Sequence, residues 1–352
     1  MNDTEVTAKL LGYLAQKFDC ASLAYAAPPA RISGGFDAAI FGFALRDAPP
    51  ALQGPLILRL NRPLVDAERI TLEAIVHNCL AGQGYMIPDV RVVETDPALL
   101  GGRFTVMTRL AGKPLAHAFE RVLGSGTILT KAAGLARIPA LVRSVTEAWV
   151  DTQVKLHALD PAPLVAAVSA GGLDPALITF DGQLSRVTAA VRQHSLEGLQ
   201  PGIEWLATHK PSLRATVCHG DFHPMNILGE GGQVSGVIDW ANAVVAPAEM
   251  DVGSAIANIA TVPLDVPAVL NMPLQMVMAY ILRRYRATYA SRRPIDDRAV
   301  RYFQTYRCVA QLVPVLVNRA KGGAGSGAFG SDRGIARLVQ HIRATSGVVI
   351  QA

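Results

Sequence analysis

The stretch "CHGDFHPMNIL" at residues 218–228 carries two histidines, an aspartate and an asparagine within eleven residues. His219 and His223 stand four apart and flank Asp221, so metal ligation is one interpretation. A phosphate-transfer loop is a second, and a set of ordinary core and capping residues is a third. The choice between them decides both the fold and the function of the chain.

Zinc ligation fits this stretch poorly. Gly220 lies between the histidines and Pro224 follows His223, and both residues disfavour the helix that would place two imidazoles on one face. Cysteines offer no alternative, because they stand far apart without a CxxC pair, as is typical of a reducing compartment. They are Cys20, Cys79, Cys218 and Cys308. The sequence therefore disfavours a zinc hydrolase.

A phosphotransfer loop accounts for more of the residues. Asp221 and Asn226 have the spacing of a kinase catalytic loop, in which the aspartate accepts or orients the acceptor hydroxyl and the asparagine carbonyl helps to hold Mg²⁺. Apolar segments at 226–228 and 234–238 flank "GEGG" and predict a hairpin that returns the chain to Asp239. We expect Asp239 to lie beside Asn226 as a second oxygen ligand of Mg²⁺. Each residue alone also fits a structural role, but their order and spacing together favour catalysis.

Composition limits the classes of function. A chain of 352 residues suits two lobes, and its net charge of +5 is spread without a dense Lys/Arg run, which argues against a nucleic-acid or membrane-surface partner. The N-terminus lacks the apolar core of a signal peptide. The longest uncharged apolar stretch, residues 266–282, contains two prolines and is short for a membrane span. We therefore expect a cytoplasmic protein.

Hydrophobic patterning predicts an α+β chain in two parts. Residues 1–110 indicate a small, strand-rich lobe with one main helix, and residues 111–352 a larger, mostly helical lobe that contains the 218–228 stretch. In the first part we predict helical spacing at 6–14, a glycine turn followed by a strand within 30–45, strands at 54–60, 89–96 and 102–110, and a helix at 66–84. In the second we predict helices at 148–160, 185–207, 274–290 and 297–318, and a flexible loop at 321–332.

The motif pair "HGDFHPMNIL…GVIDW" closely resembles the aminoglycoside phosphotransferase and choline kinase-like family, whose fold is similar to that of eukaryotic protein kinases. His-Gly-Asp replaces His-Arg-Asp there, and Ile-Asp-Trp replaces Asp-Phe-Gly. "ISGGFDAAIFGF", "VMTRLAGKPL" and "LHALD" look like its glycine-containing hairpin, its hinge and the helix before its catalytic region. The resemblance runs over about residues 32–253. It implies a bilobal protein-kinase-like fold and an ATP- and Mg²⁺-dependent phosphotransferase that acts on a small-molecule hydroxyl.

The resemblance assigns roles in the catalytic region. Asp221 would be the catalytic base, while Asn226 and Asp239 would bind Mg²⁺. His219 would brace the loop, and His223 would either do the same or touch a phosphate or the acceptor.

The segment after "IDW" holds one more matching residue. Asp251 in "PAEMDVG" matches a family aspartate that ties this segment to the catalytic loop, although a helix cap is an equally good interpretation. Ala246 stands where relatives often have an acidic residue, and Asp37 where a small hydroxyl residue is common. These two departures weaken any close transfer from a named member.

The nucleotide would be held by residues of the N-lobe. Arg59 occupies the third-strand position of the phosphate-binding cation, and an arginine fork is competent to bind two phosphate oxygens. Glu73 is its best helix partner, with Glu68 as the runner-up. The resemblance further implies backbone contacts to phosphate or adenine from Gly34, Gly35, Met107, Thr108 and Leu110.

The acceptor is the least determined part of the prediction. The family acts on aminoglycosides, macrolides, choline, homoserine and sugars, so the resemblance leaves the substrate open. From Val252 to the C-terminus the chain has thirteen Lys/Arg against four Asp/Glu, which favours a neutral or anionic acceptor over a polycation. Alternatives are an aminoglycoside or macrolide kinase, a nucleotidyl transferase, and a pseudokinase that acts through a partner. A pseudokinase usually lacks one of the three catalytic and metal residues, and all three are present.

Overall fold

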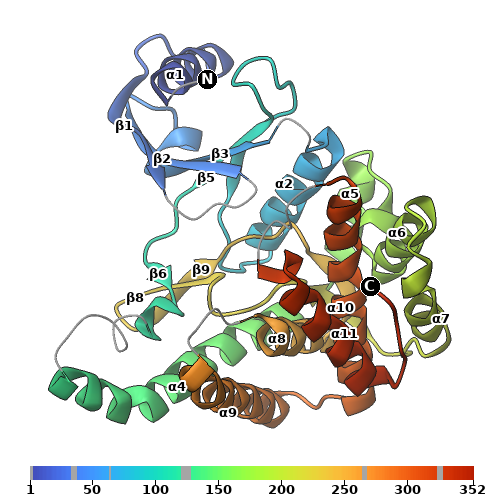
Figure 1. The fold of residues 1–352 in the computed structure, drawn as a ribbon. Coiled ribbons are helices and arrows are strands. Elements are labelled where there is room, and N and C mark those ends of the chain that lie inside the picture. The colour runs from blue at the N-terminus through green and yellow to red at the C-terminus, as the bar shows by residue number, and fades with distance from the viewer. Residues whose placement is uncertain (1–2, 33–37, 63–64, 120–127, 264–267, 323–327) are drawn as a thin grey trace. The chain divides into compact units, whose positions relative to one another are not determined.

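The computed structural model describes residues 3–32, 38–62, 65–119, 128–263, 268–322 and 328–352 (Figure 1). The chain divides into two compact units. The first comprises residues 1–112, 162–174 and 228–241, and the second comprises residues 113–161, 175–227 and 242–352. Gly34, Gly35 and Asp37 lie outside the described residues, as does part of the loop predicted at 321–332.

The first unit is built on a five-stranded antiparallel sheet with strand order β1-β2-β3-β5-β4. Its strands are β1 (Ala24–Ile32), β2 (Ala38–Arg46), β3 (Pro55–Asn61), β4 (Val90–Glu94) and β5 (Phe104–Thr108). Helix α1 (Asp3–Lys17) buries Val6, Leu10 and Leu14 in a core with β-strand residues such as Leu58 and Phe104. The residues whose apolar spacing predicted this helix thus form the stripe that covers one face of the sheet.

Helix α2 (Ala67–Gly82) packs against the other side of the sheet. Ala74 of α2 forms a small core with Val90 and Met107, and Ile57 of β3 packs against it. Successive side chains of a strand point to opposite faces, so Leu58 faces the α1 side while Ile57 and Arg59 face the α2 side. This register carries Arg59 toward α2.

Two segments from later in the chain complete the first unit. Helix α5 (Ala162–Ala170) belongs to it, and strands β8 (Ile227–Glu230) and β9 (Gln233–Val237) are hydrogen-bonded neighbours. Gly231 and Gly232 join these strands with φ of 59° and 84°, as a two-residue hairpin turn with glycines requires. The predicted hairpin is therefore present. Val237 donates its N–H to the carbonyl of Met86, which fixes the chain just before Asp239.

The second unit is mostly helical. Its strands are β6 (Lys113–Pro114), β7 (Ala215–Cys218) and β10 (Val244–Pro247), the last two paired antiparallel. Its helices are α4 (Ile128–His157), α6 (Phe180–Gln193), α7 (Gln200–Thr208), α8 (Glu249–Thr261), α9 (Ala268–Arg292), α10 (Asp297–Ala320) and α11 (Asp332–Ser346). Helices α8 and α10 pack closely at Gly253, where an added Cβ would lie 2.8 Å from the Cβ of Phe303. This contact holds α8 and α10 close together.

One predicted element is wrong: residues 185–207 do not form a single helix. Helix α6 ends at Gln193, Ser195 has a left-handed φ of 49°, and α7 begins at Gln200 with a proline in its first turn. A left-handed residue interrupts helical hydrogen bonding, and a proline suits the start of a new helix. Within the described part of the chain, no helix is both long and apolar enough to cross a membrane.

Candidate active site

A glycine turns the chain from β7 into the catalytic loop. Gly220 has a φ of 79°, and a Cβ added there would lie 2.1 Å from the carbonyl oxygen of Asn242. Only glycine fits both the left-handed conformation and this close approach. His219, which precedes this glycine, is fully buried. Its Nδ1 accepts a hydrogen bond of 3.2 Å from the N–H of Asp221, which follows the glycine. The loop is thus shaped by its own sequence.

Asp251, in the first turn of α8, fastens this loop from the other side. Its carboxylate accepts the N–H of His219 at 2.9 Å and the N–H of Gly220 at 2.6 Å. The Nε2 of His157 lies 3.0 Å from the same carboxylate, and its Nδ1 lies 2.6 Å from the hydroxyl of Tyr289. A carboxylate only accepts hydrogen bonds, so Nε2 of His157 is the donor. Asp251 therefore contacts the catalytic loop directly, in addition to lying at a helix start.

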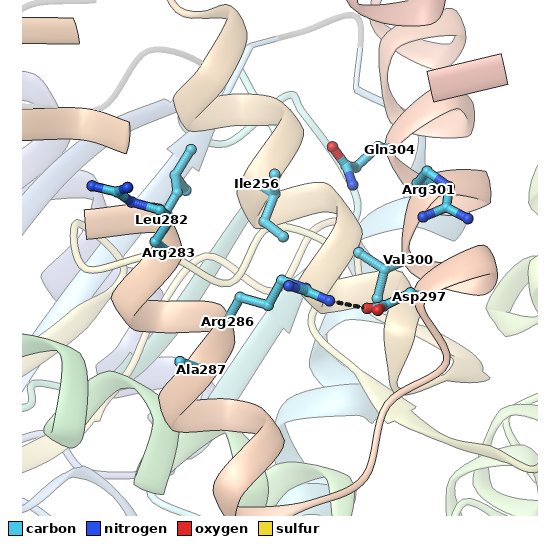
Figure 2. Close-up of a pocket in the computed structure, with 9 residues that line it drawn as sticks. All are labelled: Ile256, Leu282, Arg283, Arg286, Ala287, Asp297, Val300, Arg301 and Gln304. Carbon is cyan, nitrogen blue, oxygen red and sulfur yellow. Dashed lines mark hydrogen bonds and ion pairs between the residues drawn. The ribbon is translucent and has the colours of Figure 1, made fainter. Parts of the chain in front are cut away.

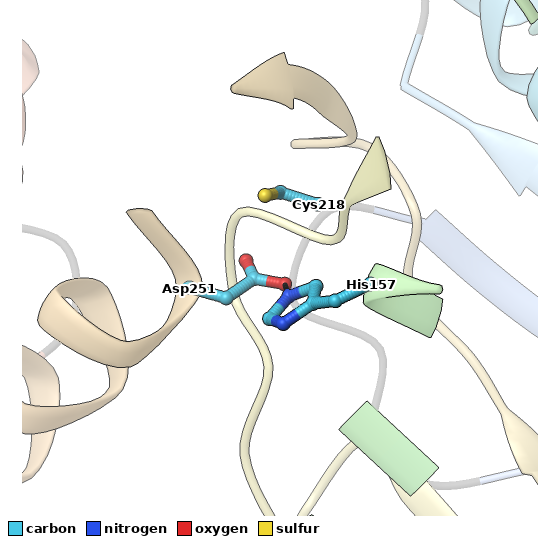
Figure 3. Close-up of side chains that lie close together, drawn as sticks. All are labelled: His157, Cys218 and Asp251. Atoms are coloured by element: carbon cyan, nitrogen blue, oxygen red, sulfur yellow. Dashed lines mark hydrogen bonds and ion pairs between the residues drawn. The ribbon is translucent and has the colours of Figure 1, made fainter. Parts of the chain in front are cut away.

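Cys218 joins His157 and Asp251 in a buried cluster whose potential ligand atoms lie within 4.8 Å of one another (Figure 3). Burial raises the pKa of the Cys218 thiol well above its usual value. The thiol donates to the carbonyls of Ala246 and Pro247 at 3.5 and 3.4 Å, while both carboxylate oxygens of Asp251 already accept hydrogen bonds. A protonated thiol and an occupied carboxylate are poor metal ligands. The cluster is a structural clamp.

The carboxylate of Asp221 lies among hydrogen-bond donors. Its Oδ1 accepts from Asn258 at 2.6 Å and from Arg307 at 3.2 Å, and the Nε2 of His223 lies 3.5 Å away. Burial alone raises the pKa of Asp221, but the hydrogen bond from His223 and the charge of Arg307 outweigh it and hold that pKa well below its usual range. The side chain remains 19% exposed. Asp221 is thus an ionised carboxylate that an incoming molecule can still reach.

Sequence reasoning did not identify Asn258, Arg307 or Gln311 as members of this site. The oxygen of the Asn258 amide accepts from Nε of Arg307 at 2.9 Å and from Nε2 of Gln311 at 3.0 Å. Asn258 and Arg307 stand 37 and 86 residues beyond Asp221, on α8 and α10. No local motif links residues so far apart. His157, by contrast, lies in the "LHALD" stretch that the resemblance had marked.

Asn226 is held so that its oxygen is left for another partner. Its Nδ2 donates to the backbone carbonyl of Asp221 at 3.0 Å, and its own N–H donates to the carbonyl of His223. The side-chain oxygen must then point away from that carbonyl. Asn226 is a candidate oxygen ligand in the second unit.

In the first unit, Arg59 forms an ion pair with Glu73, and its Nη2 lies 3.9 Å from Oδ1 of Asp239. Arg59 and Glu73 are mostly buried, whereas Asp239 is half-exposed and has a left-handed φ of 67°. Glu68, the alternative partner, is exposed. A non-glycine residue held in this conformation is a feature that clusters at functional sites. The structure thus brings together three of the predicted residues.

The three predicted hinge residues differ in what they can offer a nucleotide. Met107 and Thr108 belong to the β5 ladder, where they pair with Ile57 and Leu56 of β3. Thr108 also donates its N–H to the carbonyl of Asp89 and accepts the N–H of that residue with its hydroxyl. Leu110 lies beyond the last residue of the strand. Of the three, Leu110 is the best placed to bind a base through its backbone.

A cavity of about 440 Å³ lies between α8, α9 and α10 (Figure 2). Three arginines line it, namely Arg283, Arg286 and Arg301, together with Gln304. Asp297 is the acidic residue of the lining, and it forms an ion pair with Arg286. The cavity therefore has an excess of positive charge.

Asp221 and Asn226 have the spacing of a kinase catalytic loop and lie on an α+β framework. Residues 31–295 match the phosphotransferase enzyme family (APH), and the chain belongs to that family. It is therefore an enzyme of the small-molecule kinase class, as predicted. Among curated proteins, no sequence matches this chain.

Solved structures with the same fold include antibiotic kinases. One is a thermostable mutant of aminoglycoside phosphotransferase APH(4)-Ia in a ternary complex with AMP-PNP and hygromycin B, 16% identical, with a TM-score of 0.56 over 97% of this chain and 99% of that one. Another is the macrolide 2'-phosphotransferase MphH from Brachybacterium faecium, 17% identical, with a TM-score of 0.53 over 97% and 99%. The predicted protein-kinase-like α+β fold is confirmed.

Proposed function

We propose that this enzyme moves the γ-phosphoryl group of ATP, with Mg²⁺, to a hydroxyl of a neutral or anionic small molecule. The observation that carries the proposal is the geometry of Asp221, a partly exposed carboxylate that accepts from Asn258 and Arg307 on a loop whose N–H groups are bound by Asp251. A residue in this state can orient a hydroxyl and take its proton.

The reaction would proceed by direct transfer. The acceptor oxygen forms a bond to the γ-phosphorus, the bond from that phosphorus to the β–γ bridging oxygen breaks, and ADP leaves with the electron pair. Asp221 takes the hydroxyl proton. Its low pKa makes it a weak base, which suits a loose transition state in which positioning matters more than early proton removal.

The first unit supplies groups for the nucleotide. Arg59 would bind phosphate oxygens through its planar fork, and Glu73 holds that fork in place. Leu110 would contact the base through its backbone. A nucleotide analogue is bound in the APH(4)-Ia structure of the same fold, which supports ATP as the donor.

The residues assigned to Mg²⁺ have the right chemistry for it. Asn226 presents an amide oxygen whose orientation is fixed, and Asp239 presents a half-exposed carboxylate. Hard oxygen donors of this kind suit Mg²⁺, which keeps several waters and shares its coordination with phosphates. When bound, the ion would neutralise charge on the phosphate oxygens.

Carboxylates of the second unit are largely engaged with other groups, which argues against a polycationic acceptor. Asp296 accepts the N–H groups of Arg298 and Ala299 at the start of α10. Asp297 and Asp332 form ion pairs with arginines. The arginine-lined cavity of this unit adds positive charge.

An antibiotic kinase is the second candidate, because one protein of the same fold is an aminoglycoside phosphotransferase in complex with hygromycin B and another is a macrolide 2'-phosphotransferase. At 16–17% identity, however, those structures show only the fold. A pseudokinase is disfavoured, because Asp221, Asn226 and Asp239 are all present.

The test is a screen of ATP consumption across hydroxyl-bearing metabolites and antibiotics, with and without Mg²⁺. Mass spectrometry of the product separates phosphoryl from nucleotidyl transfer. We expect Mg²⁺-dependent phosphorylation of a neutral or anionic compound. A product that carries AMP, or the absence of Mg²⁺-dependent ATP consumption with every compound, would refute the proposal.

Asp239→Ala should weaken Mg²⁺-dependent ATP binding more than Asn226→Ala does. An ionised carboxylate contributes more than a neutral amide beside a doubly charged hard ion. ATP titrations of both variants with and without Mg²⁺ measure the difference. Equal affinities that do not depend on the metal would contradict the assignment of both ligands.

A further inference from the structure

The hydrogen bonds around Asn258 have a fixed direction. Asp221 can only accept, so the Asn258 amide turns its Nδ2 toward that carboxylate. Its oxygen then faces Arg307 and Gln311, and both donate to it. The orientation of the Gln311 amide is fixed in turn, with Nε2 bonded and Oε1 left over.

Oε1 of Gln311 is buried and has no hydrogen-bond partner among the described residues. A buried acceptor in this state has lost its bonds to water and gained none in return, so it calls for an explanation. The side-chain nitrogens of Arg307 and both polar atoms of the Asn258 amide have partners. The Gln311 oxygen can therefore accept from one further donor.

Arg307 places a positive charge beside the carboxylate of Asp221. The two side chains are 17% and 19% exposed, and the contact to Oδ1 measures 3.2 Å. Within the described part of the chain, no hydrogen bond reaches Oδ2 of Asp221. Arg307 contacts Asp221 directly and Gln311 is linked to it through Asn258, so we take these two side chains as the neighbours of a substituent beside a reacting hydroxyl at Asp221.

Three kinds of substituent can be compared at that position. An ammonium could donate to Gln311, but Arg307 repels it. A carboxylate could pair with Arg307, but it has no proton for Gln311. A hydroxyl can accept from the guanidinium and donate to Oε1 at the same time.

We propose that Arg307 and Gln311 select an acceptor with a second, uncharged hydroxyl beside the one that is phosphorylated. The substrate class is then a neutral polyol or sugar. This inference rests on the proposed function, because it takes Asp221 as the group that receives the reacting hydroxyl.

The experiment uses matched acceptors that differ at one position: D-glucose against D-glucosamine, and glycerol against serinol and glycerate, each with MgATP. We expect kcat/KM for the better polyol to exceed that of its amino analogue by about tenfold or more, because like charges in contact oppose binding. In Arg307→Gln the ratio should fall to about threefold or less, while Arg307→Lys, which keeps the charge, should retain most of it.

Gln311→Met provides an independent variant, since it keeps the side-chain volume and removes both the carbonyl oxygen and the nitrogen of the amide. It should raise KM for the polyol by about tenfold, the loss of one buried hydrogen bond, and leave the affinity for MgATP unchanged. Arg298→Gln, an exposed position in the first turn of α10, serves as the matched control. Melting temperatures show which variants are folded.

Two results would overturn the inference while leaving the proposed function intact. One is normal MgATP binding without transfer to any polyol of the set. The other is an amino analogue that remains the better acceptor, or a ratio that is the same in the wild type, Arg307→Gln and Gln311→Met. Absence of both MgATP binding and phosphoryl transfer would instead refute the proposed function itself.

Discussion

At the scale of single residues, the site residues fall into two groups, those close together in the sequence and those far apart in it. The spacing of Asp221 and Asn226 and the hairpin that leads to Asp239 were visible in the sequence, because one short segment carries them. The partners Asn258 and Arg307 were not, because α8 and α10 bring them to Asp221 only after folding. An asparagine and an arginine in separate helices form no sequence motif that would mark them as residues of one site.

Arg59→Met should weaken ATP binding while the protein stays folded. The variant keeps most of the apolar stem and removes the charged fork, and hydrogen bonds to charged groups are worth about 1.5–3 kcal/mol, or roughly tenfold to a hundredfold in affinity. Equilibrium titration with ATP measures the change. Glu68→Gln is the control, because Glu68 is exposed. Unchanged affinity in Arg59→Met would remove this residue from the nucleotide site.

At the scale of elements, periodicity predicted several long helices but missed α8, α11 and the first part of α4, and it predicted short strands poorly. Helices α1, α2 and α10 follow their apolar stripes closely. Strands β7 and β10 have four residues each, too few for an alternating pattern to show. The break between α6 and α7 lies at Ser195, whose left-handed conformation is uncommon for a serine and so could not be expected from its residue type.

Gly220→Ala should disrupt the catalytic loop. The left-handed conformation alone costs about 1–3 kcal/mol for a residue with a Cβ, and the contact with the Asn242 carbonyl adds to it. Chemical unfolding measures the loss of stability, and turnover should fall with it. Gly82→Ala at the end of α2 is the control, because an added Cβ there meets no atom within 4 Å. Equal stability of the two variants would contradict this account of the loop.

The packing of α11 should make stability depend on pH through His341. Burial, and then the charge of Arg337, lower the pKa of His341, while its Nε2 lies 3.0 Å from Oε1 of Gln304. The unfolded chain therefore binds a proton at a higher pH than the folded protein does. Stability is fully present above the unfolded pKa of about 6.5 and is lost as pH falls below it, at no more than about 1.4 kcal/mol per pH unit.

His341→Gln keeps the polar contact and removes the titration. Free energies of unfolding at pH 7, 6 and 5 should therefore fall less steeply in this variant than in the wild type. The same pH dependence in both proteins would show that His341 does not contribute.

At the scale of the whole molecule, the distribution of charge was predicted from the sequence, but the partner of each charged side chain was not. The excess of Lys/Arg after Val252 is evident from composition. Only the structure shows that Asp296 caps a helix while Asp297 and Asp332 bind arginines. These three carboxylates are thus engaged with other groups.

Aminoglycosides such as kanamycin should accordingly be poor acceptors. Several convergent carboxylates are needed to bind a polycation, and like charges that face it oppose binding. The measurement is kcat/KM for a panel of aminoglycosides against macrolides, sugars and amino-alcohols. A value above about 10⁴ M⁻¹s⁻¹ for any aminoglycoside, the lower end of normal enzymes, would contradict this prediction.

Phosphoryl transfer by wild type and Asp221→Asn, with the best acceptor of the screen and γ-labelled ATP, tests the central claim most directly. The variant is nearly isosteric but cannot take the hydroxyl proton. Turnover should fall on the order of 10² or more, the usual loss when a general base is removed, while the affinity for MgATP stays nearly unchanged. Retention of more than about a tenth of wild-type turnover would show that Asp221 is not the catalytic base.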